Sequence, residues 1–231
     1  LDAADQREVV LRAVGGVAVS LRCPSARREP LRRGYKDLDL VGRSGEAGAI
    51  GALMADLGYQ ADREFNVLHG HQRLYFWDAA NQRQLDVFID NFEMCHRLDL
   101  KDRLDLERRT LPLADLLLTK LQVVELNEKD VKDAAAILAD HDLAPKAIDS
   151  ERIVSLLGSD WGWWRTTTEN LGKLRDYATS LGDLEEAGAI TERLNRLMRR
   201  IEETPKSVKW KLRARVGERV RWYDLPEEVD A

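Results

Sequence analysis

The chain has 231 residues, of which 44% are hydrophobic and 33% charged, a composition typical of a folded globular protein of one or two domains. No stretch approaches the roughly 18 uninterrupted apolar residues that a membrane helix needs, so we expect no membrane segment. No basic-then-apolar leader opens the chain, and two cysteines cannot form a disulfide framework. We therefore expect a cytoplasmic protein with reduced thiols.

The net charge is −5, but the positive charge is concentrated in two segments. Residues 22–36 contain six Arg or Lys and one Glu, and residues 191–222 contain eleven Arg or Lys and four Glu. An acidic protein with two basic segments is not expected to coat nucleic acid indiscriminately. The pattern fits a contact with phosphate at one place, and it equally fits two solvated basic faces.

Before residue 110 the sequence predicts short strands separated by turns. A helix is expected from Val17, and Ser44 is the expected N-cap of another that ends near Leu57. Residues 72–77 (QRLYFW) and 84–89 (QLDVFI) predict the two strands of a hairpin. Residues 35–41 (YKDLDLV) predict a strand by their alternation, whereas residues 98–106 fit a strand or a loop.

After residue 110 the pattern is mostly helical. Thr110-Leu-Pro112 is typical of a helix start, and Asn127 is the expected N-cap of a helix over residues 128–139. More helices are expected at about residues 150–157, 168–181 and 184–201. The segment after Thr204-Pro205 fits a helix or a strand, and we favour the helix.

Acidic residues lie at matched places on two predicted strands. Asp37 and Asp39 are two apart, so on a strand they share one face while the leucines between them take the other. Asp86 interrupts the apolar segment LDVFI, and it joins the pair if the two strands are neighbours. Adjacent carboxylates repel each other, and a divalent cation such as Mg²⁺ is the natural compensation. Three carboxylates can hold two cations that assist an oxygen nucleophile and a pyrophosphate leaving group.

The glycine pair Gly15-Gly16 follows an apolar segment and precedes a predicted helix. Glycine lets the backbone approach phosphate closely, and the N-terminus of a helix presents free N–H groups. Two other candidate patterns are weaker. His69-Gly-His71 lacks the further ligands of a zinc site, and Cys95-His96 lacks an identifiable base for a nucleophilic thiol.

The order VGGVAVSL, KDLDLV and LDVFI resembles the DNA polymerase β-like nucleotidyltransferase superfamily, whose signature is Gly-Gly or Gly-Ser, an Asp-x-Asp strand and a later Asp strand. The segment LADLLLTKLQVVELNEKDVKDAAAIL resembles the helices that follow the catalytic core in the AbiEii-like, toxin-type branch. The resemblance covers roughly residues 8–140. The interval of twenty residues between Gly16 and Asp37 is longer than usual for the family and suggests a basic insertion.

The resemblance implies an α+β fold, in which a mixed β-sheet flanked by helices is followed by a C-terminal helical subdomain. Together with the change of sequence pattern near residue 110, it makes residues 1–110 the nucleotidyltransferase core and residues 111–231 the helical region. It also implies transfer of a nucleoside monophosphate from an NTP to an acceptor hydroxyl with Mg²⁺. The metal ligands and catalytic residues would be Asp37, Asp39 and Asp86.

Other residues have less certain roles in this scheme. The backbone of Gly15 and Gly16 would hold the triphosphate. Lys120 would contact phosphate or would extend from a packed helix to solvent. Further site candidates are Lys36, Asp130 and Asp133, the last two being equally explained as charges on a helix surface.

The acceptor and the partners have competing interpretations. RNA could be bound through residues 22–36 and 191–222, and a toxin-type protein would have an antitoxin-like protein partner. The alternatives are an enzyme that modifies an antibiotic-type small molecule, and a catalytically idle fold used for binding. Five of the six tryptophans follow residue 160, where they could stack on bases but more commonly pack a helical subdomain.

Overall fold

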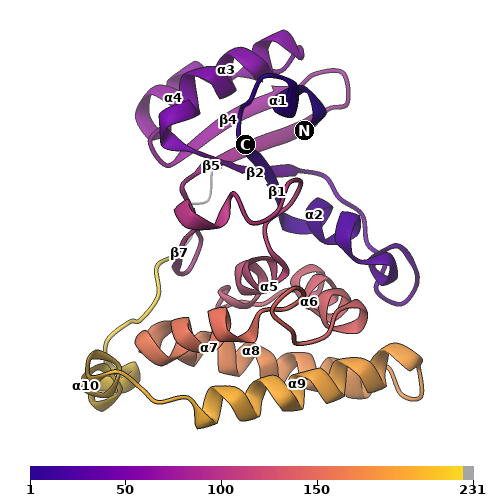
Figure 1. The fold of residues 1–231 in the computed structure, drawn as a ribbon, viewed down its shortest axis with the longest axis vertical. Helices are drawn as coiled ribbons and strands as arrows, with labels where there is room; N and C mark the ends of the chain where they lie inside the picture. Colours follow the sequence, from indigo (N-terminus) through magenta and orange to yellow (C-terminus); the bar gives the residue numbers. More distant parts are fainter. Residues whose placement is uncertain (226–231) are drawn as a thin grey trace. The chain divides into compact units, whose positions relative to one another are not determined.

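The computed structural model describes residues 1–225 and divides the chain into two compact units. The first contains Leu1–Leu21, Gly34–Phe92 and Arg97–Pro112, and the second contains Arg22–Arg33, Glu93–His96 and the residues from Leu113 onward. Figure 1 labels the elements of both units. The predicted fold class is confirmed: the protein is α+β, with a mixed sheet flanked by helices and a C-terminal set of helices. Among the helices of residues 1–225, none is long and apolar enough to cross a bilayer.

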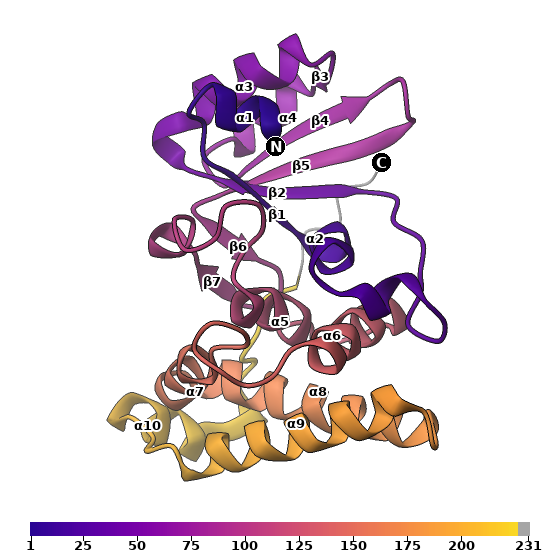
Figure 2. The ribbon, with the colours of Figure 1, turned by 45° about the vertical axis from the view of Figure 1, so that its right-hand side comes forward.

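The first unit is built on a sheet with strand order β1-β2-β5-β4-β3. Strands β2 and β5 are parallel, whereas the other neighbours are antiparallel. Figure 2 shows these strands with helices α1 and α3 along one side. The bounds are α1 Asp2–Gln6, β1 Leu11–Val14, α2 Gly15–Arg22, β2 Leu38–Gly42, α3 Ala47–Asp56, β3 Gln60–Ala61, α4 Arg63–His69, β4 Arg73–Asp78, β5 Arg83–Ile89, β6 Asn91–Glu93 and β7 Arg97–Asp99.

The two faces of this sheet differ in chemistry because side chains alternate along each strand. One face supplies the apolar core with α1 and α3, and its residues include Leu40, Leu85, Val87 and Phe76. The opposite face carries Asp39 and Asp86, which the alternation therefore keeps out of that core. The hydrophobic effect thus fixes which way the carboxylates point.

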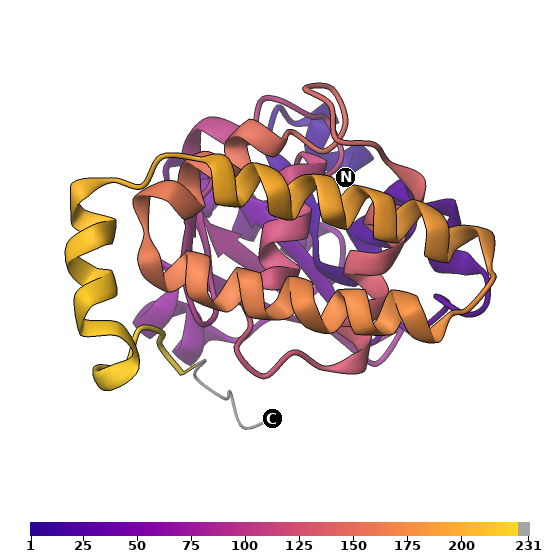
Figure 3. The same cartoon turned by 90° about the horizontal axis from the view of Figure 1, so that it is seen from below.

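The second unit is helical, with a two-helix hairpin of α8 and α9 that Figure 3 shows side by side. Its helices are α5 Leu113–Leu121, α6 Glu128–Asp140, α7 Ser150–Ser159, α8 Trp161–Ser180, α9 Glu185–Glu203 and α10 Val208–Val216. Side chains cap four of them at their N-termini: Asn127, Asp149, Asp160 and Ser207 each accept a backbone N–H. The buried carboxylate of Asp115 is paired with Arg152 at 3.0 Å.

Several boundaries differ from those expected from the sequence. Strand β2 begins at Leu38, so Asp37 lies just outside it and is exposed. Ser44 is not a cap, since it begins a 3-10 turn and α3 starts at Ala47. Helix α8 begins at Trp161 and not near Thr168, because Asp160 accepts the N–H of Trp163 at 3.0 Å. The segment after Pro205 is the helix α10, so the strand alternative is wrong.

The tryptophans of the second unit pack against one another. Trp164 contacts Trp210 of α10 edge-on at 5.1 Å between ring centroids, and Trp161 contacts Trp222 at 5.9 Å. The indole N–H of Trp222 donates to the hydroxyl of Thr166 at 3.0 Å. These contacts favour the packing interpretation of the tryptophan cluster over a base-stacking platform.

The burial of His96 predicts that the stability of the second unit depends on pH. Its Nε2 lies 2.9 Å from the hydroxyl of Thr166, its ring packs against Trp163, and burial lowers its pKa to about 4. Between pH 6.5 and 4 the unfolded chain binds a proton at His96 that the folded chain does not. The contribution of the neutral His96 to the free energy of unfolding is therefore fully present above pH 6.5. The free energy of unfolding should fall by up to ~3 kcal/mol when the pH is lowered from 6.5 to 4.

Denaturant unfolding followed by tryptophan fluorescence between pH 7 and pH 4.5 checks this prediction. His96→Asn should flatten the dependence, whereas His71→Asn at an exposed position of the first unit should retain it. An unchanged dependence in the His96 variant would contradict the assignment.

Candidate active site on the polar face of the sheet

One row of paired residues crosses four strands of the first unit. Val14 of β1 pairs with Asp39 of β2, Asp39 with Asp86 of β5, and Asp86 with Tyr75 of β4. Because paired residues of neighbouring strands project to the same face, Asp39 and Asp86 are side by side. The structure thus brings together two of the three predicted carboxylates, from strands that are far apart in the sequence.

Gly15 is held against the carboxylate of Asp39. It has a φ of +67°, and a Cβ built there would lie 2.2 Å from Oδ2 of Asp39, too close for two non-bonded atoms, so the Asp39 side chain would have to shift. An L-residue at this position would therefore be strained twice, by its backbone conformation and by this overlap. Gly15 and Gly16 open helix α2, whose first N–H groups have no partner within the helix. The Asp39 carboxylate therefore lies beside the start of a helix.

Asp86 is almost fully buried and both of its oxygens accept hydrogen bonds. Nε of Arg73 donates to Oδ1 at 2.7 Å, and Nε2 of Gln84 donates to Oδ2 at 2.6 Å. A carboxylate oxygen has two lone pairs, so each oxygen keeps one for a further partner. The buried charge is therefore compensated within the first unit and still able to accept another ligand.

Asp37 is near enough to Tyr75 of the same face to influence its phenol electrostatically. The pKa of the Tyr75 phenol is raised, first by burial and then by the negative charge of Asp86, with a smaller contribution from Asp37. Asp37 itself precedes β2 and is exposed, as is its neighbour Lys36. The three predicted carboxylates thus differ in exposure, with Asp86 buried, Asp39 intermediate and Asp37 open to solvent.

The donor chemistry fits a divalent cation at Asp39, although a complete site is not formed. Within residues 1–225, no group of three or more His, Cys, Asp or Glu is arranged to hold a metal ion. The expected three-carboxylate centre is therefore not assembled as such. What is present is an in-register pair of carboxylates, Asp39 and Asp86, with a third carboxylate, Asp37, two residues before Asp39, and oxygen ligands are the kind that Mg²⁺ takes.

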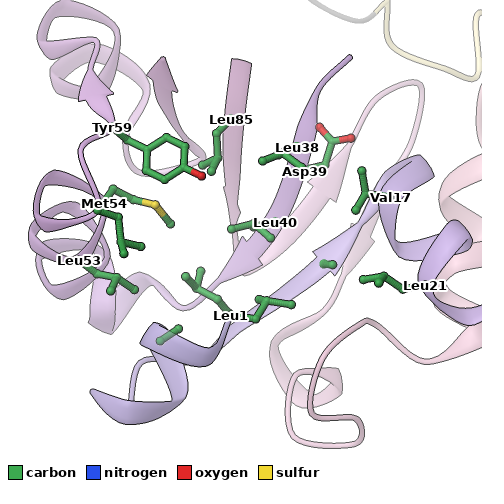
Figure 4. A pocket seen from close by; sticks show the side chains of 14 residues that line it. Leu1, Val17, Leu21, Leu38, Asp39, Leu40, Leu53, Met54, Tyr59 and Leu85 are labelled. Atoms are coloured by element: carbon green, nitrogen blue, oxygen red, sulfur yellow. The ribbon is translucent and has the colours of Figure 1, made fainter. Parts of the chain in front are cut away.

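An apolar cavity of about 220 Å³ lies in the same unit (Figure 4). Leucine, methionine and tyrosine side chains of β2, β5, α3 and the following loop converge on it, and Asp39 lines it near Val17 of α2. Leu21 and Leu57 of its lining are half exposed. Most of the lining, including Leu40, Leu53 and Leu85, belongs to the apolar core, so a compact apolar group held there would adjoin Asp39 but lie on the face of the sheet opposite to Asp86.

Lys120 forms ion pairs with two carboxylates of the second unit. Its ammonium lies 2.9 Å from Asp133 and 3.2 Å from Asp130, and Asp133 also receives two hydrogen bonds from Arg33, at 2.8 and 2.6 Å. The neighbouring carboxylates raise the pKa of Lys120 against the opposite effect of burial, which is the largest single influence. Asp133 is buried, and it is therefore more than a helix-surface charge. A contact of these residues with NTP stays a prediction.

Some cations of the basic segment 191–222 also form hydrogen bonds and ion pairs within the second unit. In α9, Arg193 donates to the carbonyls of Leu138 and Ala139, and Arg196 pairs with Asp142. Helix α10 differs, because its outward cations are exposed to solvent. They are Lys209, Lys211 and Arg215, whereas Arg213 donates to the carbonyls of Gly217 and Val220.

Sequence reasoning missed three residues of the polar face, namely Arg73, Gln84 and Tyr75. The predicted hairpin of residues 72–77 and 84–89 was the available signal. Alternation along its strands places Arg73 with Tyr75, and Gln84 with Asp86, on one face.

The Cys95-His96 pair has a structural explanation unrelated to the site. Cys95 is buried and forms no disulfide, and the ring of His96 is hydrogen-bonded to Thr166.

Comparisons with known proteins give little further guidance. No protein-family model matches the chain, and no curated protein gives a significant match. Among solved structures, that of the antibiotic-resistance factor ANT(2'')-Ia is similar to this chain with a TM-score of 0.34 and 15% sequence identity, over 87% of this chain and 90% of that one. A likeness of this size assigns neither the fold nor the activity of that factor to this protein.

Proposed function

We propose that the protein is a metal-dependent nucleotidyltransferase that transfers a nucleoside monophosphate from an NTP to an acceptor hydroxyl. The observation that carries the proposal is the close approach of Gly15 to the carboxylate of Asp39, together with the strand pairing that makes Asp86 the neighbour of Asp39. The start of a helix, which is suited to binding phosphate, therefore lies next to an acidic pair. The order of these residues in the chain is also that of the DNA polymerase β-like superfamily.

The reaction forms one bond and breaks one bond at phosphorus. The acceptor oxygen attacks the α-phosphorus, the bond from that phosphorus to the bridging oxygen breaks, and pyrophosphate leaves. The N–H groups of Gly15 and Gly16 would hold the triphosphate at the start of α2. Asp86 would accept the hydroxyl proton through the lone pairs that Arg73 and Gln84 leave available.

Asp37 and Asp39 would hold the divalent cation through carboxylate oxygens. When bound, Mg²⁺ supplies positive charge that polarises the phosphoryl group and neutralises the leaving pyrophosphate. Asp39 positions the phosphate end of the substrate because it adjoins Gly15. Two cations, as the family resemblance implies, would additionally require Asp86 as a ligand.

Two acceptor classes have support from different parts of the chain. The exposed cations of α10 support an RNA acceptor, because RNA phosphates attract clustered Lys and Arg. The cavity beside Asp39 supports a compact small molecule with an apolar part. We favour RNA as the acceptor, and an antitoxin-like protein partner remains a prediction from the toxin-type resemblance.

Asp39→Asn should weaken binding of an NTP with Mn²⁺ at least about tenfold and abolish transfer of an α-phosphorus label. The amide retains the shape of Asp39 but removes the charge that the cation needs, and the fold should remain intact because a like-charge neighbour of Asp86 is lost. Asp56→Asn, in an exposed ion pair with Arg7, is the matched control. Undiminished binding and transfer by the Asp39 variant would contradict the metal assignment.

Gly15→Ala should abolish NTP binding and lower stability by more than about 1 kcal/mol, since alanine strains the positive φ and overlaps Asp39. Gly48→Ala in α3 is the control, because a Cβ there meets nothing within 4 Å and the helix favours alanine. Equilibrium NTP binding and thermal unfolding measure both effects. If the Gly15 variant binds NTP as tightly as the unaltered protein, the phosphate-binding role is wrong.

The RNA interpretation predicts that Lys209→Gln, Lys211→Gln and Arg215→Gln together weaken RNA binding and reduce its salt dependence. Each neutralised phosphate contributes about 0.7 to the slope of log affinity against log salt. The matched triple variant neutralises the exposed Lys129, Lys146 and Arg175 elsewhere in the second unit. Equal slopes for both triple variants and the unaltered protein would favour the small-molecule acceptor.

A further inference from the structure

Asp86 already has a cation beside it, and that cation belongs to the protein. Arg73 donates from Nε to Oδ1 at 2.7 Å, and its side chain is 24% exposed against 2% for Asp86. The strand register pairs Arg73 with Phe88 and not with Asp86, so the guanidinium reaches Asp86 diagonally across β4 and β5. Arg73 therefore lies on the same face as Asp39 and Asp86.

Two aromatic rings help to fix the position of this guanidinium. Its central carbon lies 5.3 Å from the ring centroid of Phe88 and 5.9 Å from that of Phe65 in α4. Both are within the range of a cation–π contact. A planar guanidinium held by a carboxylate and by two rings is more restricted than a lysine ammonium would be. Arg73 is thus a positioned group and not a solvated surface charge.

Arg73 places a positive charge next to the acidic pair. It offsets the repulsion between Asp86 and Asp39, whose Cα atoms are expected to lie about 5 Å apart as neighbours on paired strands. A divalent cation between these carboxylates would offset the same repulsion. The guanidinium and the cation therefore contribute the same stabilisation, and the presence of one reduces the attraction for the other.

We propose that Arg73 is a built-in counter-ion that holds the Asp86 side chain in place and lowers the affinity of the free site for divalent cations. This inference rests on the proposed function, since it concerns the same carboxylates. Its consequence is that a cation enters effectively only together with the triphosphate, whose own negative charges add to those of Asp37 and Asp39. Arg73 is a positioning residue, because it acts through Asp86.

The test measures Mn²⁺ binding to the full chain without nucleotide, by the loss of the electron paramagnetic resonance signal of free Mn²⁺. Arg73→Gln should bind Mn²⁺ at least about fivefold more tightly than the unaltered protein, because a positive charge next to the carboxylates is removed. Arg73→Lys should stay closer to the unaltered protein. Arg83→Gln is the matched control, since Arg83 pairs with Asp78 at the opposite end of the same two strands.

Thermal unfolding provides a second readout. Arg73→Gln leaves the buried Asp86 without its counter-ion, so the variant should be less stable without metal and should gain more stability from Mn²⁺ than the unaltered protein does. A variant that is unfolded without metal should refold when millimolar Mn²⁺ is added, and failure to do so would contradict the proposal.

The outcomes distinguish this inference from the proposed function. Equal Mn²⁺ affinities of the Arg73→Gln, Arg83→Gln and unaltered proteins, all lost in Asp39→Asn, would overturn the counter-ion role and leave the metal assignment intact. Mn²⁺ binding that is insensitive to Asp39→Asn, or absent from all variants, would overturn both. Tighter binding by Arg73→Gln that depends on Asp39 would support both.

Discussion

The in-register pairing of the parallel strands β2 and β5 places two carboxylates side by side on one face of the sheet. Asp39 and Asp86 are therefore held in a repulsive arrangement by backbone hydrogen bonds that neither side chain can change. The surrounding groups compensate this repulsion: Arg73 and Gln84 bind both oxygens of Asp86, and Gly15 leaves room for Asp39 where any side chain would displace it. The proposed site for a cation and a triphosphate rests on these constraints.

The opposite face of the sheet explains why the arrangement is stable. Leu38 and Leu40 flank Asp39 along β2, and Leu85 and Val87 flank Asp86 along β5. These four side chains contribute to the core that α1 and α3 share with the sheet, so a shift of either strand by one residue would bury a carboxylate and expose leucines. The apolar residues thus determine the register, and the register determines the position of the acidic pair.

The parts of this picture that follow local rules could be predicted from the sequence. Alternation in KDLDLV and LDVFI indicated the two strands and their polar faces, and Asn127 indicated the start of α6. The glycine pair indicated a nearby helix start, although α2 begins at Gly15 and not at Val17. Long-range partners could not be predicted, because neither the pairing of Arg73 with Asp86 nor that of Lys120 with Asp133 has a local signal.

Helix α8 was predicted too short, since three tryptophans and a glycine in its first turn do not resemble a helix start until Asp160 is recognised as the cap. The basic character of residues 191–222 was also misleading in part, because arginines of α9 form hydrogen bonds and ion pairs within the second unit.

The proposed function requires that Asp39, Asp86 and Gly15 form one site for an NTP and a divalent cation. A crystal structure with Mn²⁺ and an NTP analogue that carries a methylene bridge between the α- and β-phosphorus tests it most directly. The account predicts an anomalous Mn²⁺ peak next to the Asp39 carboxylate and triphosphate oxygens at the backbone of Gly15 and Gly16. Nucleotide or Mn²⁺ bound only elsewhere, with the polar face of the sheet empty at saturating concentrations of both, would contradict it.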